Sequence, residues 1–223
     1  MRRPAASEER YRKSIEQAPI VDPSGRLETL LALARYTGRR INAMLQLRAA
    51  DLLLSDAGVR RALAAAGLDP ALAKHMPHAT IRWRPEADKQ GYEDIAPLRA
   101  AARAALERYL RAHPKLGDAW LFPACTRADR PMRKMDASYY LRRADQAAEL
   151  PHLERGGFHA YRRLFVVERK HLPDVDGARA GGWRDLATMK RSYQQPDPAT
   201  TLRAIENEPD NSTVDQRSTA SRN

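Results

Sequence analysis

The spacing of apolar residues along this chain limits its fold more than any other feature. Leu27, Leu30 and Ala34 fall on one face of a helix, and Thr37-Gly38 marks the end of that helix. The same spacing predicts further helical segments over residues 41–50, 59–75, 97–110, 136–149, 158–171, 174–180 and 185–193. The segment 59–75 contains one or two short helices in this prediction. We therefore expect a mainly helical chain.

One stretch departs from the helical pattern. Residues 79–96 contain β-forming residues in alternation, and Lys89-Gln90-Gly91 is typical of a turn. We predict a β-hairpin or a small three-stranded sheet here, and a loop over residues 113–135. The predicted fold class is mainly α with a small antiparallel β-sheet (α+β).

The ends of the chain differ from its middle. Residues 1–25 are polar, and we expect a leader with at most one short helix. Residues 26–206 carry enough apolar side chains for one packed domain. Residues 207–223 have almost none, and we expect a disordered tail.

The sequence is strongly basic, with 39 Lys and Arg residues against 28 Asp and Glu and a net charge of +11. This balance favours a polyanionic partner, because each phosphate neutralised by a cation releases condensed counterions. It is also compatible with a basic protein that never contacts nucleic acid. A membrane partner is not expected, since no apolar run approaches the roughly 20 residues that span a bilayer. The single cysteine, Cys125, fits a reducing compartment, and we expect a cytoplasmic location.

A histidine and two arginines could bind or activate an anion. His159 and Arg162 lie three residues apart at the start of a predicted helix, so their side chains share a face. Arg40 begins the helix after Gly38, where free backbone N–H groups favour a negative charge. Taken singly, each could equally be an ordinary surface residue.

A lysine and a tyrosine are further candidates. Lys89 lies on the predicted hairpin turn and could protonate an alkoxide leaving group. Tyr193 ends a predicted helix ten residues after Trp183. A phenol has a pKa near 10 and is a poor nucleophile unless a base or nearby cations activate it. A solvated lysine and a core tyrosine are the simpler interpretations of these residues alone.

In their order along the chain, six residues resemble the catalytic set of the tyrosine recombinases, the phage integrase family: Arg40, Lys89, His159, Arg162, Trp183 and Tyr193. The segment TGRR before a helix matches the family's threonine-glycine-x-arginine pattern and selects Arg40 over Arg39. DKQGYEDIAPL matches its hairpin lysine before a strand ending in Pro-Leu, and HAYR matches its His-x-x-Arg motif. The resemblance covers roughly residues 26–205 and implies that residues 26–206 are a catalytic domain of this family.

The sequence departs from the family pattern at three positions. Ala43 occupies a position that is commonly acidic in the family. Arg163 occupies the position after the second arginine, which is often His. Trp183 replaces a commoner His, which suggests packing and N–H donation to a phosphate rather than proton transfer.

The resemblance implies a site-specific DNA recombinase or integrase that cleaves and rejoins strands through a 3′-phosphotyrosyl intermediate. Tyr193 would attack the phosphorus, and Arg40 and Arg162 would clamp the phosphate. His159 would act as base or hydrogen-bond donor, and Lys89 would protonate the leaving 5′-oxygen. No metal, ATP or other cofactor is implied, because the phosphotyrosine conserves the energy of the broken bond.

The implied partners are double-stranded DNA and further copies of the chain, as a tetramer on DNA, with a nucleoid-associated location. Residues expected to contact DNA beside the catalytic set are Arg39, Arg163, Arg184, Lys190 and Arg191. Residues 197–206 could form a helix that docks on a neighbouring protomer or one that packs on its own domain. Family members usually carry a separate helical domain before the catalytic one, and residues 1–25 are too few to form it.

Three other functions compete with this interpretation. A type IB topoisomerase-like enzyme would use a similar set of residues, but the short chain and Trp183 favour a recombinase. An inactive DNA-binding module is less favoured because all six residues are present. A basic helical scaffold unrelated to DNA would show absent or salt-independent binding to duplex DNA.

Overall fold

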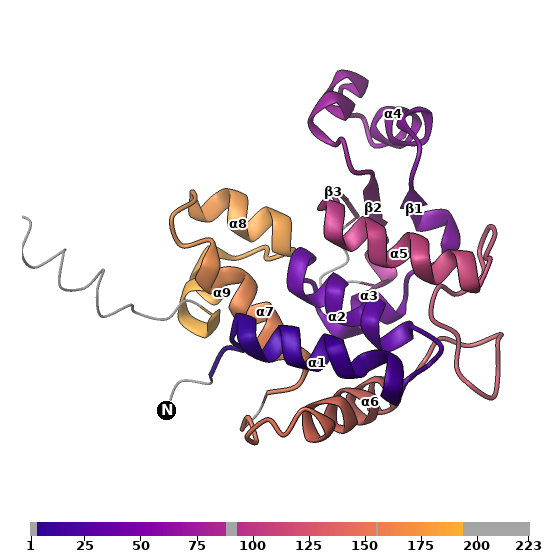
Figure 1. Cartoon of the computed structure of the whole chain (residues 1–223). Helices are drawn as coiled ribbons and strands as arrows, with labels where there is room; N and C mark the ends of the chain where they lie inside the picture. The colour runs from indigo at the N-terminus through magenta and orange to yellow at the C-terminus, as the bar shows by residue number, and fades with distance from the viewer. Residues whose placement is uncertain (1–3, 88–92, 155, 194–223) are drawn as a thin grey trace, which may run out of the picture.

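The computed structural model describes residues 4–87, 93–154 and 156–193. It confirms the predicted class, a mainly helical fold with a small antiparallel sheet (Figure 1). The α-helices are α1 Glu8–Val21, α2 Arg26–Thr37, α3 Ile41–Leu45, α4 Asp56–Ala65, α5 Ala100–Ala112, α6 Lys134–Ala147, α7 Phe158–Glu168, α8 Asp174–Gly181 and α9 Leu186–Tyr193. The strands are β1 Leu52–Leu53, β2 Thr80–Trp83 and β3 Asp94–Pro97, and 3₁₀ turns cover Ala49–Asp51, Pro70–His75 and Pro85–Ala87.

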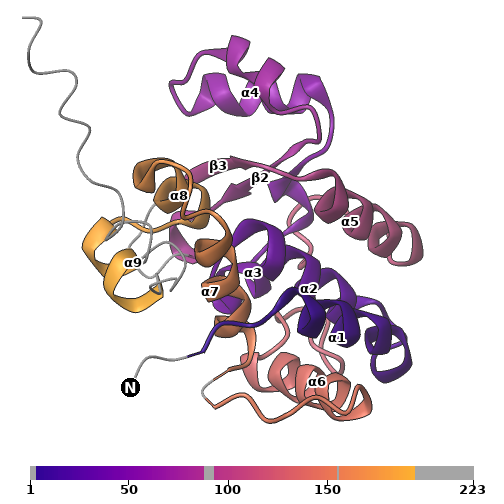
Figure 2. The same ribbon diagram turned by 60° about the vertical axis from the view of Figure 1, so that its left-hand side comes forward.

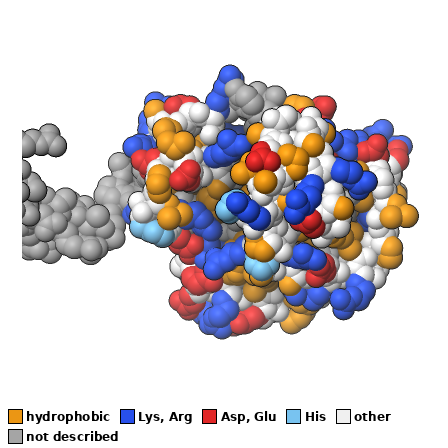
Figure 3. Space-filling model, turned by 90° about the horizontal axis from the view of Figure 1, so that it is seen from above, with side chains coloured by type: hydrophobic (Ala, Val, Ile, Leu, Met, Phe, Trp, Pro, Cys, Tyr) orange, Lys and Arg blue, Asp and Glu red, His pale blue; other side chains and the backbone are white. Residues whose placement is uncertain are grey.

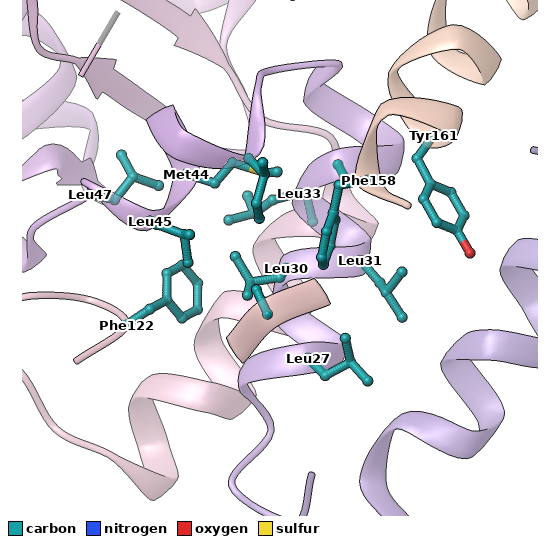
Figure 4. Close-up of a cluster of buried hydrophobic side chains, with 14 of the residues drawn as sticks. Leu27, Leu30, Leu31, Leu33, Met44, Leu45, Leu47, Phe122, Phe158 and Tyr161 are labelled. Atoms are coloured by element: carbon teal, nitrogen blue, oxygen red, sulfur yellow. The ribbon is translucent and has the colours of Figure 1, made fainter. Parts of the chain in front are cut away.

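Helix α2 lies at the centre of the fold. Its leucines are buried on several faces, and α1, α5 and α7 pack around it. A helix that is apolar on most sides requires such surroundings. Figure 4 shows Leu27, Leu30 and Leu31 beside Phe158 of α7 and Phe122 of the loop before α6. Truncating one such leucine to alanine costs about 2–5 kcal/mol in typical cores, so this cluster fixes the helices that carry the site.

Helix α1 differs from the polar leader that we expected over residues 1–25. It spans 14 residues and packs against α2 and α6. Arg10 donates to Asp145 of α6 at 2.7 Å, and the buried Ser14 hydroxyl donates to the same carboxylate at 2.7 Å. The described residues before position 26 therefore belong to the same packed unit. We expected at most one short helix here, and its length was not predicted because its buried face consists mostly of polar or small residues, which do not produce an apolar repeat.

The sheet has the order β1-β2-β3, and both pairs of strands are antiparallel. The predicted strands are β2 and β3, and Ile81 at their centre pairs with Ala96 on one side and Leu52 on the other. Pro97 ends β3 rather than opening a helix, so α5 begins at Ala100. The expected hairpin turn with Lys89 lies outside the described residues.

Helix α4 and the 3₁₀ turn Pro70–His75 project beyond the sheet (Figures 1 and 2). They form a small apolar cluster with Ile95 of β3, in which Val59 and Leu63 are buried. These are the short helices predicted within residues 59–75, and α7, α8 and α9 also lie where helices were predicted. In the part of the chain that the structure describes, no helix combines the length and apolarity needed to cross a bilayer.

Gly38 links α2 to α3 and provides a test of this packing. It has a φ of +63°, and a Cβ atom there would lie 2.5 Å from the ring of Phe165 in α7. We expect Gly38→Ala to lower the free energy of unfolding by about 3 kcal/mol through strain and overpacking. Gly67→Ala is the matched control, because its φ is +70° but nothing lies within 4 Å, and we expect a loss of about 1 kcal/mol. Urea denaturation measures both, and equal losses would contradict the proposed contact with Phe165.

Candidate active site

Three connections in the fold bring five of the six predicted catalytic residues together, and the sixth, Lys89, lies outside the described residues. The turn at Gly38 places Arg40 as the N-cap of α3, and α7 carries His159 and Arg162. The link from α8 to α9 carries Trp183, and Tyr193 is the last residue of α9. Figure 2 shows α7, α8 and α9 grouped on one side of the molecule beside α3.

Arg162 is the most deeply buried charged group of the site, with 1% of its surface exposed. Its Nη1 donates to the carbonyl oxygen of Gly38 and, at 2.6 Å, to that of Gly181. Its guanidinium carbon lies 3.3 Å from the ring centroid of Trp183 and 5.3 Å from that of Tyr193. The Arg162 side chain thus bonds the ends of α2 and α8 and lies close to Tyr193, the expected nucleophile.

Two nitrogens of the Arg162 guanidinium group lack a hydrogen-bond acceptor among the described residues. Among the described residues, none accepts a hydrogen bond from Nε or Nη2 of Arg162, and both atoms are buried. Burial lowers the pKa of Arg162 to about 9; the nearby Tyr193 oxygen opposes this fall, although it does not form a well-aligned hydrogen bond. The group therefore stays charged at neutral pH. A buried cation with unused donors is costly, and an anion placed against it would remove that cost.

The imidazole of His159 is uncharged at neutral pH. Burial and, after it, nearby cationic side chains lower its pKa to about 4. Those side chains, in order of decreasing effect, are Lys134, Arg162, Arg163 and Arg40. A neutral imidazole can accept a proton, so His159 is suited to act as a base in this cationic environment.

A cavity of about 690 Å³ lies between α3, the end of β2, the start of α6, and α7. The cations that line it are Arg39, Arg40, Arg84, Arg133, Lys134 and Arg162, and the acidic residue that lines it is Glu86. Ala43 also lines this cavity and is buried, so the position that is commonly acidic in the family contributes no charge here. Figure 3 shows Lys and Arg side chains spread over the face seen from above. The excess of positive charge suits an anionic ligand.

Arg39 and Arg163, which we expected to contact DNA, are buried, and their contact with DNA stays a prediction. Arg39 is 5% exposed, forms an ion pair with Asp94 of β3, and lies 5.1 Å from the ring centroid of Trp83. Arg163 is 2% exposed, and its Nε donates to the carbonyl oxygen of Pro4 at 2.5 Å. Arg39 therefore ties the Gly38 turn to the sheet, and Arg163 holds the segment before α1.

The remaining basic candidates lie at the surface of α9 and the segment before it. Arg184, Lys190 and Arg191 are exposed, and Lys190 forms an ion pair with Asp174 of α8 at 2.6 Å. Their predicted contact with DNA stays a prediction.

Sequence reasoning missed three cations of the cavity wall, Arg84, Arg133 and Lys134. Arg84 follows β2 and bonds Asp51 at 2.6 Å and Asp118 at 2.8 Å. Lys134 is the first residue of α6. The basic pair Arg133-Lys134 directly before a predicted helix was the available signal, but it fell within the segment assigned to a loop.

The sequence pattern of the phage integrase family matches residues 11–199. The chain belongs to the phage integrase family. A comparison with curated protein sequences gave no significant match.

Solved structures share the fold. XerA recombinase is 17% identical, with 94% of this chain and 67% of that chain covered and a TM-score of 0.65. XerH site-specific recombinase bound to its difH substrate is 19% identical, with 92% and 55% covered and a TM-score of 0.63. A lambda integrase tetramer bound to a Holliday junction is 18% identical, with 94% and 51% covered and a TM-score of 0.60. The chain thus spans between about half and two thirds of the length of these proteins.

The lowered pKa of His159 predicts how stability depends on pH. In the unfolded chain His159 takes up a proton near pH 6.5, whereas in the folded chain it does so only near pH 4. The unfolded state therefore binds more protons in this window, and the free energy of unfolding should fall as pH drops from 6.5 to 4. Urea denaturation at several pH values measures the slope. His159→Gln should lose this part of the slope, and an unchanged slope in that variant would contradict the assignment.

Proposed function

We propose that this chain is a site-specific recombinase that cleaves and rejoins double-stranded DNA through a phosphotyrosine at Tyr193. The observation that carries the proposal is the environment of Arg162. This buried cation has unused donors, lies against Trp183 and Tyr193, and lines a cationic cavity with Arg40. Such a site fits one phosphate group next to one nucleophile.

The charges in the cavity suit the transition state of phosphoryl transfer. A phosphodiester carries one negative charge, and its pentacoordinate transition state places more negative charge on the non-bridging oxygens. Arg40 and Arg162 would hold those oxygens, because bidentate guanidinium–phosphate contacts strengthen as the charge develops. The buried Nε1 of Trp183 has no hydrogen-bond partner among the described residues, which supports the expected role as a further donor.

Neutral His159 can take the phenolic proton while the oxygen of Tyr193 bonds to phosphorus. The bond from phosphorus to the 5′-oxygen breaks, and that oxygen receives a proton for which Lys89 is the candidate donor. Attack of a 5′-hydroxyl on the phosphotyrosine reverses these steps and releases the tyrosine. The strand is rejoined without a further energy source.

The partners and assembly of the chain are part of the proposal. Lambda integrase has been solved as a tetramer on a Holliday junction, and XerH on its difH substrate. We propose that this chain also acts on duplex DNA as a homo-oligomer in the nucleoid. That the matched structures are recombinases and integrases favours strand exchange over the relaxation of supercoils.

Replacing the nucleophile tests the proposal directly. On a nicked duplex that traps the intermediate, the chain should form a covalent protein–DNA adduct visible by denaturing electrophoresis. Tyr193→Phe should abolish the adduct, because the attacking oxygen is absent, while DNA binding and stability stay near those of the parent chain. An adduct of equal yield in Tyr193→Phe would show that another residue attacks.

Arg40 is the better arginine for measuring transition-state binding. Arg162 also supports the fold through Gly38 and Gly181, so its replacement changes stability as well as chemistry. Arg40→Gln should slow adduct formation in a single turnover by about 100-fold or more, the usual cost of one lost transition-state donor. Thermal unfolding checks that this variant is folded. A rate within threefold of the parent chain would remove Arg40 from the reaction.

A further inference from the structure

We infer that Lys134, the first residue of α6, is a further phosphate-binding residue of this site. The inference rests on the proposed function, since the phosphate in question is that of the DNA backbone. Lys134 is not among the residues that carry the family resemblance.

The position of Lys134 in the cavity is the first support. Lys134 lines the same cavity as Arg40 and Arg162, but it enters from α6, whereas the two arginines come from the start of α3 and from α7. A phosphate in the cavity would therefore meet positive charge from a third direction. The start of α6 is held in place, because the buried Met132 donates from its backbone N–H to the carbonyl oxygen of Phe122 at 2.8 Å.

Among the described residues, no carboxylate forms an ion pair with Lys134. Three other cations of the cavity wall have carboxylate partners: Arg39 with Asp94, Arg84 with Asp51 and Asp118, and Arg133 with Asp136. Within the described ranges, Lys134 has no such partner, and its side chain is exposed to the cavity and to solvent. An ammonium group on a flexible stem can reach a phosphate oxygen as a point charge.

The electrostatic effect of Lys134 on His159 is a further support. Of the cations that lower the pKa of His159, Lys134 has the largest effect, ahead of Arg162 on the same helix as the imidazole. The charge of Lys134 therefore acts on the imidazole of His159. The buried Ala43 adds no carboxylate that would compete with a phosphate for Lys134.

The test compares Lys134→Gln and Lys134→Arg with the control Arg142→Gln. Arg142 is an exposed cation eight residues further along α6, about 12 Å from Lys134, and its replacement removes the same charge from the same helix. Binding to a short duplex is measured against salt concentration in the Tyr193→Phe background, where no strand is cut. Log K falls as log salt rises, and Lys134→Gln should make this fall shallower by about one unit of slope. Lys134→Arg should restore the slope of the parent.

Two further readouts separate a phosphate contact from a structural role. In chains with Tyr193 intact, Lys134→Gln should slow single-turnover adduct formation at saturating DNA by about tenfold or more, and Arg142→Gln should not. In the free protein, proton NMR should show the pKa of His159 rising in Lys134→Gln and staying constant in the control. Unchanged thermal unfolding would show that the variants are folded.

The outcomes distinguish this inference from the proposed function. If the parent chain forms no adduct but Lys134→Gln still lowers the salt slope, the contact with phosphate stands and the proposed cleavage fails. If the adduct forms and Lys134→Gln matches Arg142→Gln in salt slope and rate, the inference is overturned and the proposed function stands.

Discussion

The buried guanidinium group of Arg162 is the interaction on which the rest of the site depends. Its bonds to the carbonyl oxygens of Gly38 and Gly181 bring the end of α2 and the end of α8 to one point. Arg40 and Trp183 each follow one of these glycines after a single intervening residue. The geometry of the cation therefore determines where the other donors lie. A side chain that only contacted DNA from the surface would not have this effect.

One part of the Arg162 guanidinium group forms hydrogen bonds within the fold, and another part has donors without an acceptor among the described residues. Nη1 of Arg162 completes two backbone carbonyl groups, whereas Nε and Nη2 have no acceptor among the described residues. Typical proteins pair nearly all buried polar groups, so a persistent exception indicates a ligand. Leaving these donors unpaired reduces stability, and that loss is recovered when an anion binds. Because Nη1 is held by the backbone while Nε and Nη2 lack acceptors, the site can be rigid and still favour the binding of an anion.

Much of this arrangement was predictable from residue order, and the failures have physical reasons. Apolar spacing was sufficient for α2 and α7, and the threonine-glycine-x-arginine pattern separated Arg40 from Arg39. The burial of Arg39 was not predictable, because its partner Asp94 lies 55 residues away and is brought close only by the sheet. Arg162 bonds to backbone carbonyl groups, which leave no signature in a sequence. Lys134 was missed because its importance depends on where the loop before α6 ends in space.

The crowding of cations also determines the state of the base. Burial and, after it, the charges of Lys134, Arg162, Arg163 and Arg40 disfavour the charged imidazole, so His159 is neutral in the free protein. A phosphate placed among these side chains cancels part of their field, and the imidazole then becomes a better proton acceptor than it was in the empty site. The basicity of His159 would thus increase when the substrate is present and the tyrosine must be deprotonated. In the proposed mechanism, Ala43 replaces the usual acidic residue, and the charge of the bound phosphate would supply the anion that raises the basicity of His159.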